Sequence, residues 1–148
     1  MTTEEMARRA LDEIEIRNLI SRVAHLADEC PVENLSEYIA NWTEDATWEF
    51  RPAPGVVSPD HPRKGHAEIL QGAKERRQAR VQGPGTHNRH VVTTQLVDVK
   101  GDVATSTSYM FWVKNASSPG LEFLVLLIDT CRRTQDGWKL AARVVASA

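Results

Sequence analysis

The sequence predicts an α+β protein in which N-terminal helices pack on a curved, mainly antiparallel sheet. Apolar residues recur at helical spacing in the first half of the chain, whereas from residue 86 they alternate with the period of two that is typical of strands. Short turns of the hairpin type, such as Lys-Gly-Asp and Gln-Asp-Gly, separate the strand segments. Helices that come first and strands that come last indicate an α+β domain rather than repeated βαβ units.

The bulk properties fit one folded domain over residues 1–148. A chain of 148 residues can bury a hydrophobic core, and no linker or internal repeat divides it. The net charge of −2 gives no general attraction for nucleic acid or an anionic membrane, so neither is expected as a partner. The basic run at residues 74–80 is expected to be a solvated helix face.

Residues 1–15 are polar and charged, and the longest apolar run, residues 123–128, is too short to span a bilayer. We therefore expect a cytoplasmic protein. Cys30 and Cys131 lie far apart and match neither a zinc signature nor a disulfide framework, so free thiols are expected.

Three segments show the helical pattern. The first begins near Thr2 or Thr3, which can cap it, and stops at Pro31. The second repeats its apolar residues at i, i+3, i+4 and i+7 from Leu35 to Trp42. The predicted helices cover residues 4–29, 33–42 and 65–81.

A short strand at residues 47–51 precedes a loop at residues 51–65 that contains four prolines. This loop is long enough to form the rim or lid of a pocket. Long strands are then predicted at about residues 87–99, 102–114, 121–134 and 137–147, and residues 115–120 should form the turn between the middle two. Helices on one face of a bent sheet leave an interior space in which a small ligand could bind.

Asp28 and His90 are the candidates for proton transfer. Asp28 lies near the end of the first helix, where it is either a surface residue or a buried functional one. His90 shares one face of its strand with Val92 and Leu96, which favours an inward orientation, and His87 falls on the opposite face. If the two groups meet, the carboxylate fixes the imidazole tautomer and stabilises the imidazolium, so that His90 can remove a proton from a substrate.

A metal site is the competing use of the histidines. His87 and His90 point to opposite faces of a strand and cannot both bind one metal without a bulge, and His61 and His66 lack a matching carboxylate spacing. The sequence also lacks a glycine-rich phosphate loop and a dinucleotide fingerprint. We therefore expect neither a metal nor a cofactor.

Arg143 shares one face of the last strand with Ala141 and Val145 and is predicted to point inward. It could stabilise an oxygen that gains charge, or it could simply pair with a carboxylate. Aromatic side chains and one histidine are predicted to line a flat apolar pocket, although core packing explains each aromatic residue taken alone. These residues are Tyr38, Trp42, Trp48, Phe50, His87, Tyr109 and Trp112.

The order of these segments resembles the SnoaL-like branch of the NTF2-like superfamily. It is similar to the group that contains scytalone dehydratase, the hexachlorocyclohexane dehydrochlorinase and bile acid 7α-dehydratase. The resemblance covers nearly the whole chain and rests on "IEIRNLISRVAHLADE", "LSEYIANWTEDATWEF", "KGHAEIL", "RHVVTTQLVDVKGDVATSTSYMFWV" and "DGWKLAAR". It implies a cone-shaped barrel, an Asp–His pair at Asp28 and His90, and a functional arginine at Arg143.

One departure from this pattern limits the reaction. The dehydrochlorinase has a lysine five residues before its aspartate, where this chain has Val23, and the first helix also lacks the tyrosine used by bile acid dehydratase. Dehydrochlorination is therefore not expected. Another group would have to assist the leaving group, and Tyr38, Tyr109 and Arg143 are the candidates.

The resemblance and the residues together predict a cofactor-independent lyase or isomerase, similar to a dehydratase. Its substrate would be a small hydrophobic molecule of aromatic, polyketide or steroid-like type. The alternative is a non-catalytic ligand-binding protein, or the small subunit of a complex like the aromatic-ring dioxygenases. The apolar outer face of the sheet, together with the resemblance, implies a homodimer or homotrimer.

Overall fold

The computed structural model describes residues 1–115 and 120–148. Its helices are α1 (Thr3–Glu29), the single 3-10 turn η1 (Val32–Asn34), α2 (Leu35–Ile39) and α3 (Gly65–Gln78). Its strands are β1 (Trp42–Arg51), β2 (Arg63–Lys64), β3 (Arg89–Lys100), β4 (Val103–Lys114), β5 (Gly120–Thr134) and β6 (Gly137–Ser147). Most of the turn predicted at residues 115–120 lies outside the described residues.

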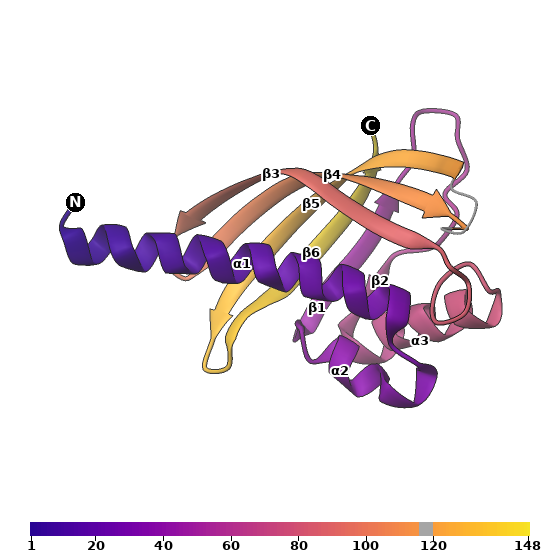
Figure 1. The fold of residues 1–148 in the computed structure, drawn as a ribbon, viewed down its shortest axis with the longest axis horizontal. Helices are drawn as coiled ribbons and strands as arrows, with labels where there is room; N and C mark the ends of the chain where they lie inside the picture. Colours follow the sequence, from indigo (N-terminus) through magenta and orange to yellow (C-terminus); the bar gives the residue numbers. More distant parts are fainter. Residues whose placement is uncertain (116–119) are drawn as a thin grey trace.

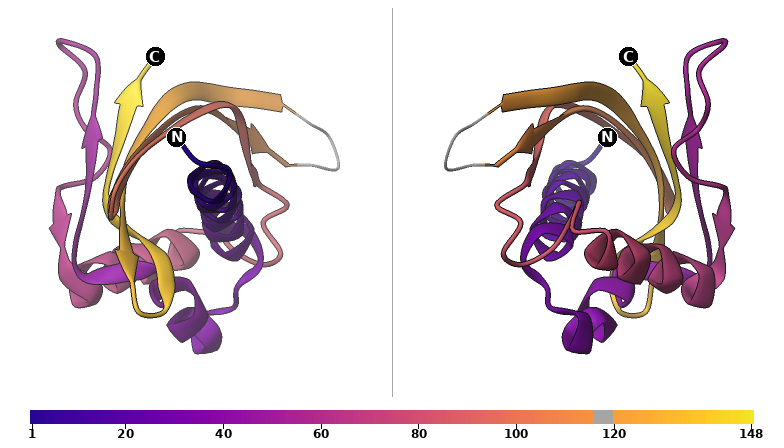
Figure 2. Two further views of the ribbon diagram at one scale, coloured as in Figure 1. Left: turned by 90° about the vertical axis from the view of Figure 1, so that its left-hand side faces the viewer. Right: turned by 90° about the vertical axis from the view of Figure 1, so that its right-hand side faces the viewer.

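The strands form a single sheet in the order β2-β1-β6-β5-β4-β3. Neighbouring strands are antiparallel except β1 and β6, which are parallel. The sheet curls around α1, and α2 and α3 lie together at one end of it (Figures 1 and 2). The prediction of helices packed on a curved, mainly antiparallel sheet is therefore confirmed.

Helix α1 begins and ends where the sequence indicates. Thr2 and Glu5 form a reciprocal capping box, in which the backbone N–H of Glu5 donates to the Thr2 hydroxyl at 3.1 Å. The helix ends at Glu29, just before Cys30 and Pro31. No helix among the described residues is long and apolar enough to cross a membrane.

The second predicted helix is shorter than its apolar pattern suggests. Helix α2 ends at Ile39, and Trp42 is already the first residue of β1. Trp42 pairs with Leu140 of β6, and the backbone N–H of Leu140 donates to the carbonyl of Asn41 at 2.9 Å. Pairing with a distant strand thus overrides the local helical pattern. The sequence also gave no indication of the short strand β2.

Two bulges decide which side chains face the interior of the sheet. Thr94 has a φ of 52°, and the pairing of β3 with β4 shifts between Thr93 and Leu96. As a result Val92 packs against the core, whereas Leu96 is 75% exposed, so the prediction that they share a face is wrong.

A similar shift occurs in the pairing of β5 with β6, where Thr130 pairs with Ala142 but Cys131 pairs with Leu140. Ala141 is the extra residue. Leu140 before the bulge and Arg143 after it are therefore both buried. The prediction that Arg143 points inward is confirmed, although the alternation used to predict it is broken at Ala141.

Cys30 and Cys131 are both buried and free, as the sequence predicts. Burial raises the pKa of the Cys131 thiol to about 12. A thiol with this pKa carries almost no thiolate near neutral pH, so Cys131 is a packing residue rather than a nucleophile.

Asp12 ties the first half of α1 to the hairpin of β5 and β6. Its carboxylate accepts two hydrogen bonds of 2.8 Å from Arg133 and one of 3.0 Å from the indole N–H of Trp138. The Arg133 guanidinium also lies 4.6 Å from the centre of the Trp138 ring. The hydrogen bonds from Arg133 are the main reason that the pKa of Asp12 lies below its ordinary value, and Trp138 adds to the effect.

A lowered pKa in the folded state makes the ionised Asp12 stabilising. This contribution is complete above the ordinary pKa of aspartate, about 3.9, and is lost as the pH falls through the lower pKa of the folded state. We expect Asp12→Asn to reduce the free energy of unfolding by roughly 1–3 kcal/mol at pH 7. The difference from the wild type should shrink between pH 4 and pH 2 in a series of urea denaturation curves. Asp98→Asn, which removes an exposed ion pair with Lys100, should change stability little. A wild-type advantage that is independent of pH would contradict this account.

Candidate active site

A cavity of about 430 Å³ lies between α1 and the inner face of the sheet. Its wall is mostly apolar, with Val23 and Ala27 from α1, Met110 from β4 and Leu127 from β5. The loop after β1 and the segment between α3 and β3 close it on other sides. A few polar side chains reach this apolar space: Tyr38, Asp60, Arg76, Gln82, His90 and Arg143.

Asp28 and His90 meet at the wall of this cavity. Oδ1 of Asp28 lies 2.6 Å from Nδ1 of His90, and the backbone N–H of His90 donates to Oδ2 at 3.1 Å. The Asp28 side chain is 7% exposed and that of His90 is 17% exposed. The carboxylate therefore lies behind the imidazole. It holds both the ring and the backbone of His90 at the start of β3.

This contact also defines which nitrogen can act. A carboxylate oxygen accepts hydrogen bonds, so Nδ1 of His90 is the donor in this contact and Nε2 is the ring nitrogen that faces away from Asp28. His90 lines the cavity and Asp28 does not. The arrangement directs Nε2 toward Gln82, another lining residue, and places behind Nδ1 a carboxylate acceptor of the kind that can stabilise an imidazolium.

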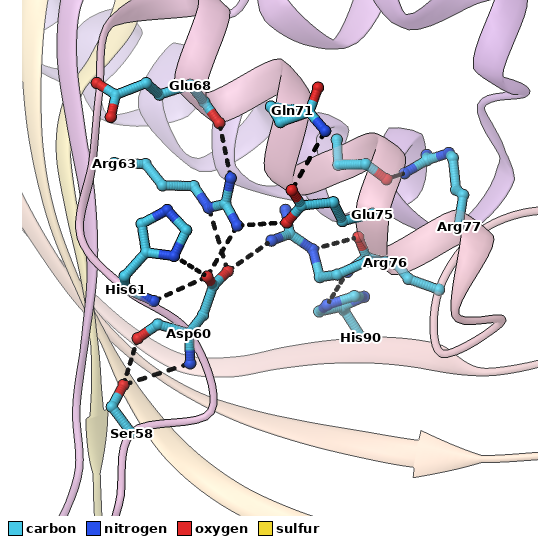
Figure 3. Close-up of polar contacts among 12 residues, drawn as sticks. Ser58, Asp60, His61, Arg63, Glu68, Gln71, Glu75, Arg76, Arg77 and His90 are labelled. Carbon is cyan, nitrogen blue, oxygen red and sulfur yellow. Dashed lines mark hydrogen bonds and ion pairs between the residues drawn. The ribbon is translucent and has the colours of Figure 1, made fainter.

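Gln82 and Arg76 continue the polar chain beyond His90. The amide nitrogen of Gln82 lies 3.1 Å from Nε2 of His90, and Nε of Arg76 donates to the amide oxygen of Gln82 at 3.1 Å. Nη1 of Arg76 lies 3.4 Å from Oδ2 of Asp60. Figure 3 shows how Asp60, Arg76 and His90 follow one another in this chain of polar contacts.

The basic run at residues 74–80 is therefore not simply a solvated face, which corrects the prediction. Arg76 lines the cavity, and Arg77 donates to the carbonyls of Leu26, Ala27 and Cys30 at the end of α1. Neighbouring positions on a helix point about 100° apart, so a run of charges can serve two buried surfaces at once. The charge pattern alone contains no signal for this.

Asp60 is held in place by Arg63, the most buried side chain of this network. Arg63 donates to Asp60 at 2.8 and 3.2 Å and to Glu75 at 2.7 Å, and it is 4% exposed (Figure 3). Burial by itself would raise the pKa of Asp60, but the hydrogen bonds from Arg63 and from the backbone of His61 outweigh it and lower that pKa. The network fastens the loop of residues 52–62, which carries Pro59 and Asp60, to α3.

Arg143 lines the cavity as half of a buried ion pair. Its Nε and Nη2 donate to the two carboxylate oxygens of Asp129 at 2.7 and 2.9 Å, and Asp129 is completely buried. Burial opposes the charge of Arg143, but the nearby carboxylate outweighs it and raises the pKa of the guanidinium. Both roles left open by the sequence are thus compatible with its position, although Asp129 already balances its charge.

Four of the predicted pocket residues line the cavity: Tyr38, Trp48, Phe50 and Trp112. Trp112 stacks on Phe123 with ring centres 5.4 Å apart, and Phe123 is a lining residue that the sequence did not single out. Strand β5 presents Phe123 to the interior because it pairs directly with Trp112 of β4.

The other three predicted pocket residues lie elsewhere, which corrects the predicted lining. Trp42 is 1% exposed in the core, with the Arg143 guanidinium 5.8 Å from its ring centre. His87 is exposed just before β3 and has a φ of 60°. Tyr109 is 44% exposed, because its neighbours Ser108 and Met110 occupy the inward positions of β4.

No three His, Cys, Asp or Glu side chains in the described part of the chain come together as a set that could hold a metal ion. The polar groups of the cavity can instead hold hydrogen-bonding groups of an organic ligand. The fold and this site together define a mostly apolar pocket with a histidine, held by a buried carboxylate, at its wall.

The comparison with known families agrees with the fold. A family model described as the SnoaL-like domain matches residues 8–144, and the chain therefore belongs to the SnoaL-like domain family. This family includes polyketide cyclases, isomerases and dehydratases. No curated protein matches the sequence.

Solved structures show the same NTF2-like fold. An NTF2-like protein with a cystatin-like fold from Novosphingobium aromaticivorans is 25% identical, with a TM-score of 0.78 over 97% of this chain and 86% of that chain. Two further proteins from the same organism are described as a "putative aromatic ring hydroxylase" (21% identity, TM-score 0.72, 93% and 90% of the chains) and a "putative scytalone dehydratase" (13% identity, TM-score 0.73, 97% and 88%). The predicted resemblance to the SnoaL-like and NTF2-like proteins is confirmed.

The packing of Arg63 gives a prediction about Gly72 of α3. A Cβ atom at Gly72 would lie 2.7 Å from Nε of Arg63, which is held by its hydrogen bonds and cannot move aside freely. Replacing a helical glycine with alanine ordinarily stabilises by about 1 kcal/mol. Here we expect Gly72→Ala to destabilise by roughly 1–3 kcal/mol in chemical denaturation, because it overpacks the Arg63 network. In an Arg63→Ala background the same change should become stabilising. Stabilisation in both backgrounds would contradict the tight contact.

Proposed function

We propose that this protein is a cofactor-independent lyase or isomerase that resembles a dehydratase. The observation that carries the proposal is the 2.6 Å contact between Asp28 and Nδ1 of His90 at the wall of an apolar cavity. The substrate would be a small hydrophobic molecule of the aromatic, polyketide or steroid-like type, because Trp48, Phe50 and Trp112 provide flat apolar surfaces.

His90 would act as the general base. Its Nε2 takes a proton from a carbon next to a carbonyl group or aromatic ring, and Asp28 stabilises the resulting imidazolium. The apolar wall lowers the local dielectric constant, so that these charge interactions are stronger than in water. Elimination of water or a shift of the double bond follows, depending on the substrate.

The residues that line the cavity narrow the choice of side chain that could assist the leaving group of the substrate. Val23 lines it, so the position that carries a lysine in the dehydrochlorinase presents an apolar side chain here. Of the three candidates from the sequence, Tyr38 and Arg143 reach the cavity and Tyr109 does not. Tyr38 is the better donor, because Asp129 already occupies two N–H groups of Arg143.

The test is a screen of hydroxylated aromatic and polyketide-like compounds for elimination, followed by variants. We expect His90→Ala to lower turnover roughly 10²–10⁴-fold, as is typical when a general base is removed. Asp28→Asn should also lower turnover, because an amide does not stabilise the imidazolium as a carboxylate does. His25→Ala, an exposed histidine on α1, is the matched control and should leave turnover unchanged. Unchanged turnover in His90→Ala on a confirmed substrate would remove the proposed base.

The outer face of the sheet supports a second proposal, that the chain forms a homodimer or homotrimer. Large apolar side chains are exposed there on neighbouring strands: Val91, Leu96, Tyr109, Leu124 and Ile128. Such a face is more typical of an interface than of a solvated surface. The same face would serve a small subunit of an aromatic-ring oxygenase complex, which is the non-catalytic alternative.

We expect a molar mass in solution of two or three times 16.6 kDa in light scattering. The double variant Leu124→Glu with Ile128→Lys should shift the protein toward the monomer, because charges are costly to bury in an interface. A homo-oligomer that persists in this variant would place the interface elsewhere. A monomeric wild type that purifies with a stable, metal-bearing larger subunit would favour the non-catalytic alternative.

A further inference from the structure

The orientation of the Gln82 carboxamide is determined by its neighbours. Arg76 has only donors, so the group facing its Nε at 3.1 Å must be the amide oxygen of Gln82. The amide N–H group of Gln82 then faces Nε2 of His90 at 3.1 Å. An amide N–H group only donates, so Nε2 of His90 is the acceptor of this bond and the ring hydrogen lies on Nδ1, facing Asp28. The lone pair that the proposed reaction needs is thus occupied by a side chain of the protein itself.

Arg76 does not depend on Gln82 to keep its position. Its Nη1 lies 3.4 Å from Asp60, which Arg63 holds (Figure 3). Its guanidinium also lies 5.5 Å from the centre of the Trp48 ring. A cation above an aromatic face is attracted to the ring. Arg76 can therefore remain at the wall of the cavity, with its Nε–H available, when Gln82 moves away.

Gln82, by contrast, lies in the segment of residues 79–88 between α3 and β3, outside any helix or strand. Arg80, Gly83, Gly85 and His87 in this segment all have positive φ. Its side chain reaches the cavity and is partly exposed. Hydrogen bonds to Val81 and Gly83 hold the backbone on both sides of Gln82, so rotation of its side chain alone can take the carboxamide out of the cavity without disturbing the helix that carries Arg76.

We propose that Arg76 and His90 form the subsite for the carbonyl end of the substrate, and that the Gln82 carboxamide occupies this subsite in the free protein. The carboxamide presents an oxygen acceptor to Arg76 and a hydrogen to Nε2 of His90. An H–C–C=O unit presents the same pair of groups, a carbonyl oxygen and an acidic hydrogen on the adjacent carbon. The substrate class that fits is therefore an enolisable ketone on an aromatic or otherwise apolar ring system. This inference rests on the proposed function and deepens it.

The chemical step balances with these groups alone. Nε2 of His90 forms an N–H bond as the α C–H bond breaks, and the electron pair of that bond forms a C=C bond while the carbonyl π pair moves to oxygen. Arg76 donates to the enolate oxygen as it gains charge. In a β-hydroxy ketone the enolate then re-forms the carbonyl and expels the hydroxyl, which takes the proton from the His90 imidazolium and leaves as water.

The test uses two compounds of nearly the same shape, 1-tetralone, which has the carbonyl group and α hydrogens, and tetralin, which lacks the carbonyl. Their affinities for the full-length protein are measured by isothermal titration calorimetry. We expect 1-tetralone to bind roughly tenfold more tightly than tetralin, as one hydrogen bond to a charged group provides. Equal affinities, or no binding of either compound, would overturn the proposal.

Variants of the two side chains have opposite expected effects. Arg76→Leu should abolish the preference for 1-tetralone, whereas Arg76→Lys should keep part of it. Gln82→Ala removes the occupant of the subsite, so the affinity for 1-tetralone should rise roughly three- to tenfold while that for tetralin hardly changes. Gln78→Ala, an exposed glutamine in the last turn of α3, is the matched control. Weaker binding of 1-tetralone by Gln82→Ala would overturn the proposal, because Gln82 would then be a ligand-binding residue rather than a placeholder.

Deuterium exchange separates this inference from the proposed function. If His90 is the base, the α hydrogens of 1-tetralone exchange with D₂O in the presence of the protein, and His90→Ala abolishes this exchange but retains the binding preference. A preference that depends on Arg76 without any exchange would uphold the subsite and contradict the general base. Exchange that depends on His90, with no effect of Arg76 or Gln82 on the preference, would contradict the subsite and uphold the base.

Discussion

The contact of Asp28 with His90 is the interaction on which the candidate site depends. One carboxylate at the end of α1 binds both the imidazole and the backbone N–H of the same residue in β3. It therefore positions the start of the strand as well as the ring. A buried carboxylate is stable only with partners of this kind, so the fold and the site share one requirement. Arg77 strengthens the same junction, because it binds the carbonyls at the end of α1.

The wall opposite α1 is organised around a second set of charges. Arg63 is buried, and its bonds to Asp60 and Glu75 hold the proline-rich loop against α3. Arg76 contacts Asp60 of this set, and this contact helps to hold its side chain at the cavity. A buried guanidinium needs several acceptors to offset the cost of leaving water. The loop that the sequence predicts as a rim is thereby anchored to α3 beside the cavity.

The two arginines of the cavity differ in how their charge is balanced. Arg143 is paired through two short bonds with the fully buried Asp129, which makes the two side chains a nearly neutral unit deep in the sheet. Arg76 shares Asp60 with Arg63 and lies farther from that carboxylate. The positive charge of Arg76 is therefore less neutralised by a carboxylate at the cavity than that of Arg143. This difference supports the proposal that Arg76, rather than the Arg143 implied by the family resemblance, is the electrostatic partner of a substrate oxygen near His90.

Local patterns in the sequence determined the α+β class and the bounds of α1 and most strands to within a few residues, whereas Asp28 and His90 were paired only through the family resemblance. These features depend on periodicity, capping and turns, or on motifs that lie within short segments. The tertiary structure alone decided that Trp42 starts a strand, that Leu96 points outward after the bulge at Thr94, and that Tyr109 lies on the outer face. It also decided that Arg76 and Gln82 belong to the cavity. The physical reason is that strand pairing and buried ion pairs join residues far apart in the chain, and a single extra residue in a strand reverses every side chain that follows it.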